Sequence, residues 1–298
     1  MSITAVIACP RFLIRCLLGI PLLFLPLVMA DKCLGQLVPP QNEQQTPAKQ
    51  ALNRGVEAFK NGQYNEAEQD FQRAKELDPH LLNARLYLAT AYASQYIPGA
   101  PAEENVAMGR KALEEFKGAL ALDAHCLPAI DGAGSISFQM AGQPFDPKMF
   151  AESKSYFADH IQLSPQDPEP YYWIGVIDWT LSYRANGELR ARYNQTALGT
   201  GLQDSEPLPS DLLAEYAREY GPIIEDGIEK MCKALELNPE YDDAMAYLNL
   251  LYRRKADTVD SETERVNLIK MADDLMDKIK EVKQKRAEAD AGPQSQPR

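Results

Sequence analysis

Three histidines are the residues of this chain whose type is best suited to metal binding or proton transfer. His80 and His125 follow two helical segments at equivalent points, where a polar turn residue is the simpler explanation, and His160 lies inside a third segment. No two histidines have the spacing of a metal-ligand pair, and the adjacent His125-Cys126 has poor geometry for one. The chain also contains no HExxH, GxSxG or P-loop sequence. We therefore expect no metal site and no cofactor.

Paired carboxylates are the second group that could do chemistry. Glu114-Glu115 and Asp242-Asp243 are such pairs, but both fall in predicted helices. Adjacent residues of a helix point about 100° apart, so we expect both pairs to lie on solvated faces rather than to form an acid–base couple. Serine is plentiful, yet three histidines suggest no triad. We predict that the protein is not an enzyme.

The elements that would position any site are clearest in residues 51–79, which read as two short helices and a turn. Leu52, Val56 and Phe59 recur at helical spacing in the first helix. Asn61-Gly62-Gln63 interrupts the run, because glycine accepts the positive φ of a turn, and Pro79 ends the second helix. The pattern predicts a helical hairpin that must bury its apolar face against a neighbour.

Small and large residues alternate along this hairpin in a recognisable order. They are Gly55, Gly62, Tyr64, Ala67, Phe71, Ala74 and Pro79. This order resembles the tetratricopeptide repeat (TPR), whose unit is about 34 residues long. The ending Ala-Lys-Glu-Leu-Asp-Pro at 74–79 recurs as Ala-Leu-Glu-Leu-Asn-Pro at 234–239, with a near copy at 119–124. The resemblance implies an all-α superhelix of about five hairpins over residues 48–286, and it says little about function.

Four further hairpins, some degenerate, complete the predicted solenoid. Their helices are expected at 83–94 and 105–122, 128–140 and 150–163, 169–183 and 211–237, and 242–255 and 262–286. The polar segment 184–210 interrupts the fourth hairpin; we interpret it as a mobile surface loop, with a packed role as the alternative. Residues 287–298 are small and polar, and we expect them to be disordered.

Two helices suggest a narrower relationship. The segments YYWIGVIDWT at 171–180 and YDDAMAYLNLLYRRKAD at 241–257 look similar to an uncharacterised family of exported bacterial TPR proteins. This similarity implies an exported solenoid with no known activity.

The first 30 residues have the features of an export signal. Arg11 and Arg15 precede an uncharged apolar run at 16–28, which ends near Ala30. The run is shorter than the roughly 20 residues of a membrane span, and two prolines interrupt it. We predict cleavage, a polar linker at 31–47, and a periplasmic or secreted protein without a stable membrane span. An uncleaved membrane anchor and lipidation at Cys33 are the alternatives.

Charge and cysteine content set further limits. The formal charge is −12, and such an acidic chain does not suit unspecific nucleic-acid binding, which needs a basic surface. Beyond residue 30 the cysteines are Cys33, Cys126 and Cys232. One pair and one free thiol, or three free thiols, are both compatible with this odd number.

Binding is the function that these observations leave. The first helices of stacked TPR hairpins line a concave inner wall. The register projects these residues onto it: Phe59, Lys60, Asn83, Ser94, Phe138, Gln139, Tyr172, Trp179, Arg253 and Arg254. Tyr172 and Trp179 are seven residues apart and share a face, whereas Tyr171 turns toward the core.

The projected groove indicates a kind of ligand. Arg253 and Arg254 predict an acidic group on it, beside an apolar side chain. The resemblance does not extend to carboxylate-clamp TPRs that bind acidic chaperone tails, because their clamp lysine and asparagine positions fall on Leu52 and Val56. We predict an exported scaffold that binds a protein or peptide of unknown identity. The alternative is a structural or auxiliary subunit of a cell-envelope assembly, which would use the outer faces.

Overall fold

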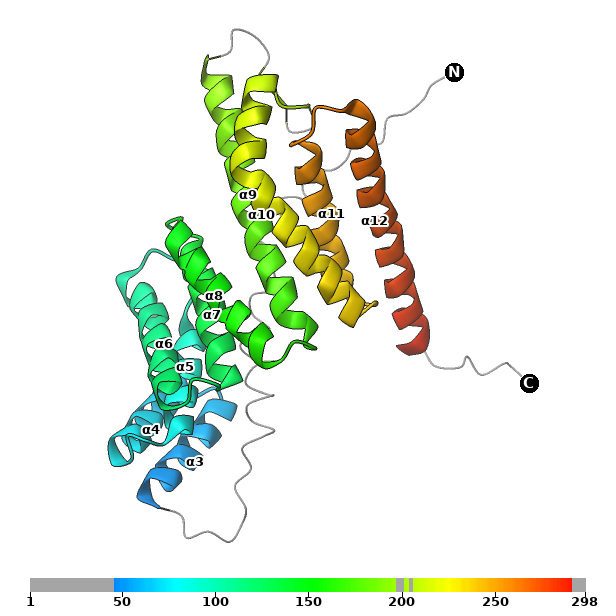
Figure 1. Cartoon of the computed structure of the whole chain (residues 1–298). Coiled ribbons are helices and arrows are strands. Elements are labelled where there is room, and N and C mark those ends of the chain that lie inside the picture. Colours follow the sequence, from blue (N-terminus) through cyan, green and yellow to red (C-terminus); the bar gives the residue numbers. More distant parts are fainter. Residues whose placement is uncertain (1–45, 197–200, 204–205, 291–298) are drawn as a thin grey trace, which may run out of the picture. The chain divides into compact units, whose positions relative to one another are not determined.

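The computed structural model describes residues 46–196, 201–203 and 206–290, and every regular element in these ranges is a helix (Figure 1). The helices are α3 (Pro47–Lys60), α4 (Tyr64–Leu77), α5 (Leu82–Gln95), α6 (Glu103–Leu122), α7 (Leu127–Ala141), α8 (Pro147–Leu163), α9 (Pro168–Thr196), α10 (Ser210–Leu237), α11 (Asp242–Ala256) and α12 (Glu262–Asp290). The predicted all-α hairpin fold is confirmed. The predicted signal at 1–30 and most of the predicted linker lie outside the described residues.

Helix α7 contains the point at which the chain divides into two compact units. The first unit ends at Ile136 and the second begins at Ser137. We describe each unit by itself.

The first hairpin forms for the local reasons that its sequence indicates. Thr46 caps α3, with its hydroxyl oxygen accepting the Lys49 N–H at 3.3 Å, and Pro47 occupies the first turn, where its missing N–H costs nothing. Gly62 adopts a φ of 74° in the turn to α4. On α4 one stripe of side chains is fully buried, Ala67, Phe71 and Ala74.

A small residue on the first helix of a hairpin faces a large one on the second. A Cβ added to Gly55 would lie 2.5 Å from two ring carbons of Phe71, so the two helices meet where only glycine fits. The second unit repeats this arrangement, since a Cβ added to Gly175 would lie 2.6 Å from Cε of Met231. Helix approach in both units therefore depends on this position.

Successive hairpins are joined by a second repeated contact. Phe71 stacks on Tyr87 with ring centroids 5.4 Å apart, and in the second unit Phe157 stacks on Trp173 at 5.9 Å. In the first unit Gly132 takes the place of the aromatic partner, beneath the ring of Phe116. Each pair is separated by sixteen residues of sequence.

The junction turns explain this constant spacing. Asp78 accepts the backbone N–H of His80 at 3.0 Å, and Asp123 accepts that of His125 at the same distance. In the second unit Asn238 accepts the N–H of Glu240 at 3.2 Å. These side-chain-to-backbone bonds fix short turns of one length. They also place His80 and His125 in turns, as their sequence positions indicate.

Helices α9 and α10 are about twice as long as those of the first hairpin. They contain 29 and 28 residues, whereas α3 and α4 contain 14 each. They run side by side (Figure 1), and the Tyr216 hydroxyl on α10 donates to the Ser182 carbonyl on α9 at 2.9 Å. The interpretation of 184–210 as a mobile loop is therefore wrong for 184–196, which continue α9 as packed helix.

A buried polar network explains why that segment packs although its sequence is polar. Asn186 donates to Asp257 at 3.2 Å, and Arg190 Nε donates to Asn186 Oδ1 at 2.7 Å. The Arg190 guanidinium also donates to the Gln203 carbonyl at 2.7 Å and lies 3.5 Å from Asp257. Because buried polar groups are costly unless paired, these side chains can occupy core positions only together.

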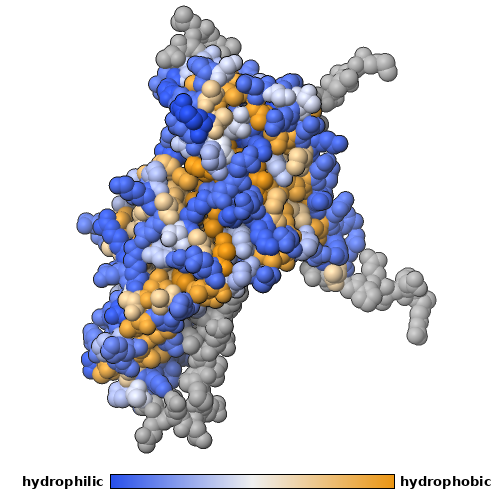
Figure 2. Space-filling model, in the orientation of Figure 1, coloured by the Kyte–Doolittle hydropathy of each residue, from blue (hydrophilic) through white to orange (hydrophobic). Residues whose placement is uncertain are grey.

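Helix α12 closes the described chain. It continues to Asp290, so residues 287–290 of the predicted disordered tail are helical, and 291–298 lie outside the described residues. Leu268, Ala272 and Ile279 form its buried stripe. On the face shown in Figure 2, apolar side chains are interspersed with hydrophilic ones. Within the described ranges, no helix combines the length and apolar character needed to cross a bilayer.

Candidate functional site

An aromatic surface forms where α9 packs beside α11 in the second unit. Tyr172, Trp179 and Tyr183 follow one face of α9, because they are separated by seven and four residues. Tyr247 of α11 lies between them, with ring centroids 5.7 Å from Tyr172 and 5.3 Å from Trp179. Tyr241, which precedes α11, lies 5.1 Å from Tyr172. We call the half-buried tyrosines 172, 183, 241 and 247 the tyrosine wall.

Buried tryptophans support this wall. Trp179 is 4% exposed beneath Tyr183, at 5.1 Å, and Tyr247. Trp173 is 5% exposed and contacts Tyr172 at 5.3 Å on one side and Phe157 and Phe138 on the other. Such packing restricts the tyrosine rotamers, so little conformational entropy remains to be lost when a ligand binds.

The tyrosine hydroxyls are neutral hydrogen-bonding groups. Burial is the main reason that the pKa of Tyr172 and that of Tyr241 are raised above the ordinary value, and nearby carboxylates raise both further. A neutral phenol can donate and accept a hydrogen bond while its ring offers apolar area. The wall can therefore contact both the backbone and the side chains of a peptide.

The two arginines predicted for the groove already have acidic partners. Arg253 donates to Asp273 of α12 at 2.6 Å and to Asn249 at 3.2 Å. Arg254 lies 3.3 Å from Asp257, with its guanidinium 5.9 Å from the Tyr183 ring. The acidic ligand group expected from these arginines is thus not favoured by the geometry.

The other residues predicted to line a groove lie in different environments. Trp179 and Phe138 are 4% and 8% exposed, so both lie beneath the surface; Gln139 is half-buried. In the first unit Phe59 packs edge-on against Tyr64 at 5.3 Å, Lys60 is exposed and Asn83 is half-buried. The Ser94 hydroxyl donates to the Thr90 carbonyl at 2.8 Å. Of the ten predicted residues, the structure brings Tyr172, Trp179 and Arg254 together around the wall.

Sequence reasoning missed three members of the wall. Tyr183 follows Trp179 by four residues, a helical spacing that could have identified it. Tyr247 follows Met231 by the sixteen residues that separate the stacked pairs, but this interval becomes informative only once the contacts are known. Tyr241 precedes its helix, where no periodicity marks it.

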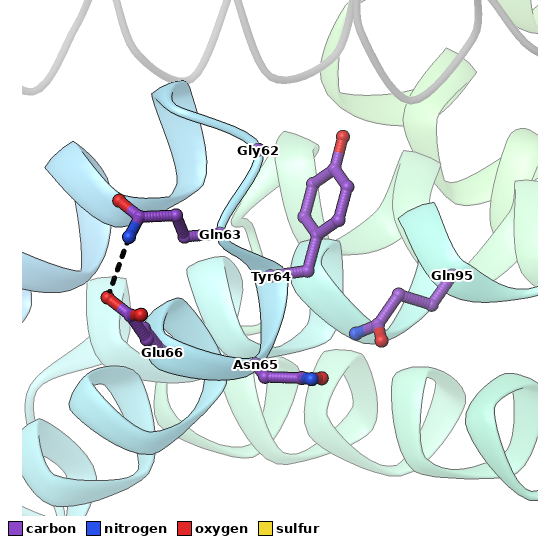
Figure 3. Close-up of a pocket in the computed structure, with 6 residues that line it drawn as sticks. All are labelled: Gly62, Gln63, Tyr64, Asn65, Glu66 and Gln95. Atoms are coloured by element: carbon purple, nitrogen blue, oxygen red, sulfur yellow. Dashed lines mark hydrogen bonds between the residues drawn. The ribbon is translucent and has the colours of Figure 1, made fainter.

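An open polar notch lies at the turn end of the first hairpin (Figure 3). Its volume is about 410 Å³, and it is lined by Gly62, Gln63, Tyr64, Asn65, Glu66 and Gln95. Gln63 donates to Glu66 at 3.0 Å, whereas Gln95 of α5 donates to the Ala91 carbonyl at 3.0 Å. Because it is open and polar, the notch offers little apolar area to a ligand.

Buried polar residues elsewhere do not form a metal site or a disulfide in the described ranges. His160 is 4% exposed, with Nε2 3.6 Å from an Asp167 carboxylate oxygen. No group of three or more His, Cys, Asp or Glu that could hold a metal ion occurs in the part of the chain that the structure describes. Cys126 is a buried free thiol and Cys232 an exposed one, while Cys33 lies outside the described residues.

Comparison with known proteins supports the repeat assignment. The tetratricopeptide repeat family model matches residues 48–81. No curated protein sequence matches the chain.

Solved structures resemble this fold at low sequence identity. A structure of MamA from Desulfovibrio magneticus RS-1, beginning at its residue 41, has a TM-score of 0.53 and 16% identity, and the match covers 81% of this chain and 98% of that one. A crystal structure of MamA protein has a TM-score of 0.51 and 15% identity, and the match covers 84% of this chain and 98% of that one. YrrB, described as a TPR protein with an unusual peptide-binding site, has a TM-score of 0.48 and 13% identity, and the match covers 82% of this chain and 91% of that one. The first two likenesses establish a shared helical repeat fold.

Proposed function

We propose, from the premise that this chain is a TPR protein, that it is a scaffold which binds a protein or peptide through the tyrosine wall of its second unit. TPR solenoids present extended surfaces for protein partners. The observation that carries the proposal is the set of half-buried tyrosines held over Trp173 and Trp179. Tyrosines on a rigid support are typical of binding hot spots.

Site-specific photo-crosslinking in the native host tests this proposal. A photo-reactive phenylalanine analogue replaces Tyr183 in the wall. The matched control carries it at Tyr220, a half-buried tyrosine of α10 that stacks on Tyr216 instead. We expect a discrete adduct from position 183 that Tyr247→Ala abolishes, and none from position 220.

The control also separates the alternative function. Adducts from position 220 alone would contradict binding at the wall and favour a structural or auxiliary subunit that uses its outer faces. Absence of any adduct at position 183 would also contradict the proposal. Circular dichroism of each variant excludes loss of fold as the cause.

Export is a further part of this proposal. Arg11, Arg15 and the apolar run at 16–28 favour a cleaved signal and a periplasmic or secreted scaffold. N-terminal sequencing of the native protein should find a mature start near Asp31. Recovery of intact Met1 in the membrane fraction would instead indicate an anchor.

A further inference from the structure

The tyrosine wall has an acidic end. The hydroxyl of Tyr241 lies close enough to Glu169 and Asp243 for both carboxylates to raise its pKa, and Asp167 and Asp242 act in the same direction. The pKa of Tyr172 is likewise raised by Asp243 and Glu169, after burial and the neighbouring tyrosines. Glu169 in the first turn of α9 and Asp243 in the first turn of α11 thus both lie near the Tyr172–Tyr241 pair, whose ring centroids are 5.1 Å apart.

The cations near this end do not neutralise all of these carboxylates. Arg286 and Lys283 of α12 lie 2.7 and 3.8 Å from Asp242. Asp243 is exposed, and no Lys, Arg or His among the described residues lies within ion-pair distance of it. Burial is the main reason that the pKa of Asp243 is raised, and Lys283 and Arg286 act to lower it, so these two cations are shared among the four carboxylates near Tyr241.

The opposite end of the wall differs in charge. Arg254 and the buried Arg190 share one carboxylate, that of Asp257, at 3.3 and 3.5 Å, whereas Arg253 pairs with Asp273 at 2.6 Å. The excess of negative charge therefore lies at the Tyr172–Tyr241 end, in a chain whose net charge is −12. A ligand is drawn to such a surface when its own charge is positive.

We propose that the Tyr172–Tyr241 end of the wall receives a lysine or arginine side chain, so that the partner of this scaffold is a basic segment of a protein. A cation over a tyrosine ring is stabilised by the ring quadrupole, and a carboxylate at its edge adds a charge-assisted hydrogen bond. Tyr247 and Tyr183 lie further along the wall, where they contact the residues beside the basic one. This inference rests on the proposed function and specifies its ligand.

Binding of defined peptides to the full chain tests the inference. Three fluorescein-labelled 12-residue peptides share a Gly/Ser scaffold with one Trp and differ only in carrying four Lys, four Glu or no charged residue. At an ionic strength of roughly 0.15 M the interaction between distant charges is screened, so contacts at the binding surface determine the affinity of each peptide. By fluorescence anisotropy, we expect the Lys peptide to bind at least about tenfold more tightly than the neutral one, since roughly 1.4 kcal/mol corresponds to tenfold. We expect no binding of the Glu peptide.

A matched pair of charge reversals separates the site from the overall charge. Asp243→Lys changes the acidic end, and Asp274→Lys makes the same change at an exposed position of α12. We expect Asp243→Lys to weaken binding of the Lys peptide about fivefold or more, and Asp274→Lys to weaken its binding less than about twofold. Asp243→Asn, which perturbs the helix start less, should show an intermediate loss.

Each other outcome overturns the inference. Equal losses in both reversals would mean that only net charge attracts the peptide, and tighter binding of the Glu or neutral peptide would mean that the sign is wrong. If no peptide binds but the position-183 adduct forms, the charge inference fails while the proposed function stands. If no peptide binds and no adduct forms, both fail.

Discussion

The α3–α4 hairpin and the α9–α10 hairpin start from the same packing and differ in how they continue. In both, a glycine of the first helix faces a fully buried side chain of the second, Gly55 with Phe71 and Gly175 with Met231. The first hairpin then ends after 14 residues per helix. The second continues for twice that length, and in its extension Asn186 and Arg190 are buried together with Ala185 and Leu189. Length beyond the repeat is thus stabilised by paired polar groups in addition to apolar ones.

Charged clusters differ between the units in the same way. In the first unit Glu115 accepts from Lys75 at 2.5 Å and from Arg85 at 2.9 Å, and the two cation side chains are 19% and 26% exposed. In the second unit Arg190 and Asp257 face each other with side chains 4% and 6% exposed. Water can replace a lost partner in the first cluster far more easily than in the second.

The largest effect should therefore come from Arg190→Ala. Because it leaves Asp257 buried with one cation fewer, we expect a loss of about 3–5 kcal/mol in the free energy of unfolding. Glu115→Gln keeps a hydrogen-bond acceptor at a wetter site and should cost about 1 kcal/mol. Urea denaturation measures both, and hydrogen exchange should place the Arg190→Ala loss in α9 and α10. Equal losses in the free energy of unfolding for the two variants would contradict the proposed difference between the buried cluster and the more exposed one.

Alanine substitutions at the two glycines compare the shared packing. Gly55→Ala places a Cβ 2.5 Å from the rigid Phe71 ring, whereas Gly175→Ala meets Cε and Cγ of the unbranched Met231 side chain at 2.6 and 2.7 Å. Overpacking against a ring should cost about 1–3 kcal/mol. Methionine can change rotamer, so Gly175→Ala should cost less than about 1 kcal/mol. Thermal denaturation gives both values, and a costlier Gly175→Ala would show that Met231 is held as firmly as Phe71.

A pH-dependent difference should appear in the second unit at Asp178. Its carboxylate is fully buried on α9, accepts from Lys154 of α8 at 2.6 Å, and faces Asp226 of α10, which also pairs with Lys154 and Lys230. Burial raises its pKa from 3.8 to about 7, although Lys154 acts in the opposite direction. At a pH between these two pKa values, Asp178 is protonated in the folded protein and ionised in the unfolded chain. Its contribution to the free energy of unfolding is therefore fully present below about pH 3.8, decreases as the pH rises, and is lost as the pH passes through 7.

Asp178→Asn removes this titration and isolates it. The stability of the wild type relative to the variant should fall as the pH rises from 4 to 7, by up to about 1.4 kcal/mol per unit. Urea denaturation across this range measures the slope. A difference that does not change with pH would mean that Asp178 stays ionised throughout, held by Lys154.

The smallest effects should come from exposed ion pairs, which do not distinguish the units. Arg54–Asp70 in the first unit and Arg253–Asp273 in the second both have 2.6 Å contacts with exposed members. We expect Arg54→Ala and Arg253→Ala each to cost about 0–1 kcal/mol, falling further in high salt. A cost above about 2 kcal/mol for Arg253→Ala alone would show that its bond to the buried Asn249 matters more than the ion pair.

The sequence predicted the regular part of this fold well, because spacing and turn residues report local structure. Gly55, Phe71 and Pro79 identified a hairpin that the structure contains. The extension of α9 was missed, since Asn186 and Arg190 look like solvent-facing residues until Asp257, some seventy positions later, pairs with them. No local pattern contains a contact of that separation.

The candidate site was predicted less well for the same reason. Tyr172 and Trp179 were predicted to share one face, and both contact Tyr247, but helical periodicity does not say that Trp179 is buried beneath the surface. Tyr247 covers Trp179, and Asp257 and Asp273 compensate the arginines, through contacts between helices. Contacts between different helices determine which side chains are exposed and which charges are unpaired. A single sequence does not show these contacts.

The constant sixteen-residue interval across each junction has a consequence for how such a chain can change. Phe71 to Tyr87, Phe116 to Gly132 and Phe157 to Trp173 all keep it, whereas the distance from Gly55 to Phe71 differs greatly from that between Gly175 and Met231. The extra length of the α9–α10 hairpin therefore lies at its tip, between Gly175 and Met231, and not at a junction between hairpins. In each unit, the edge formed by the junctions between hairpins therefore has a constant geometry. At the opposite edge, formed by the hairpin tips, the helices can differ in length. New segments, natural or engineered, are best added at that free edge.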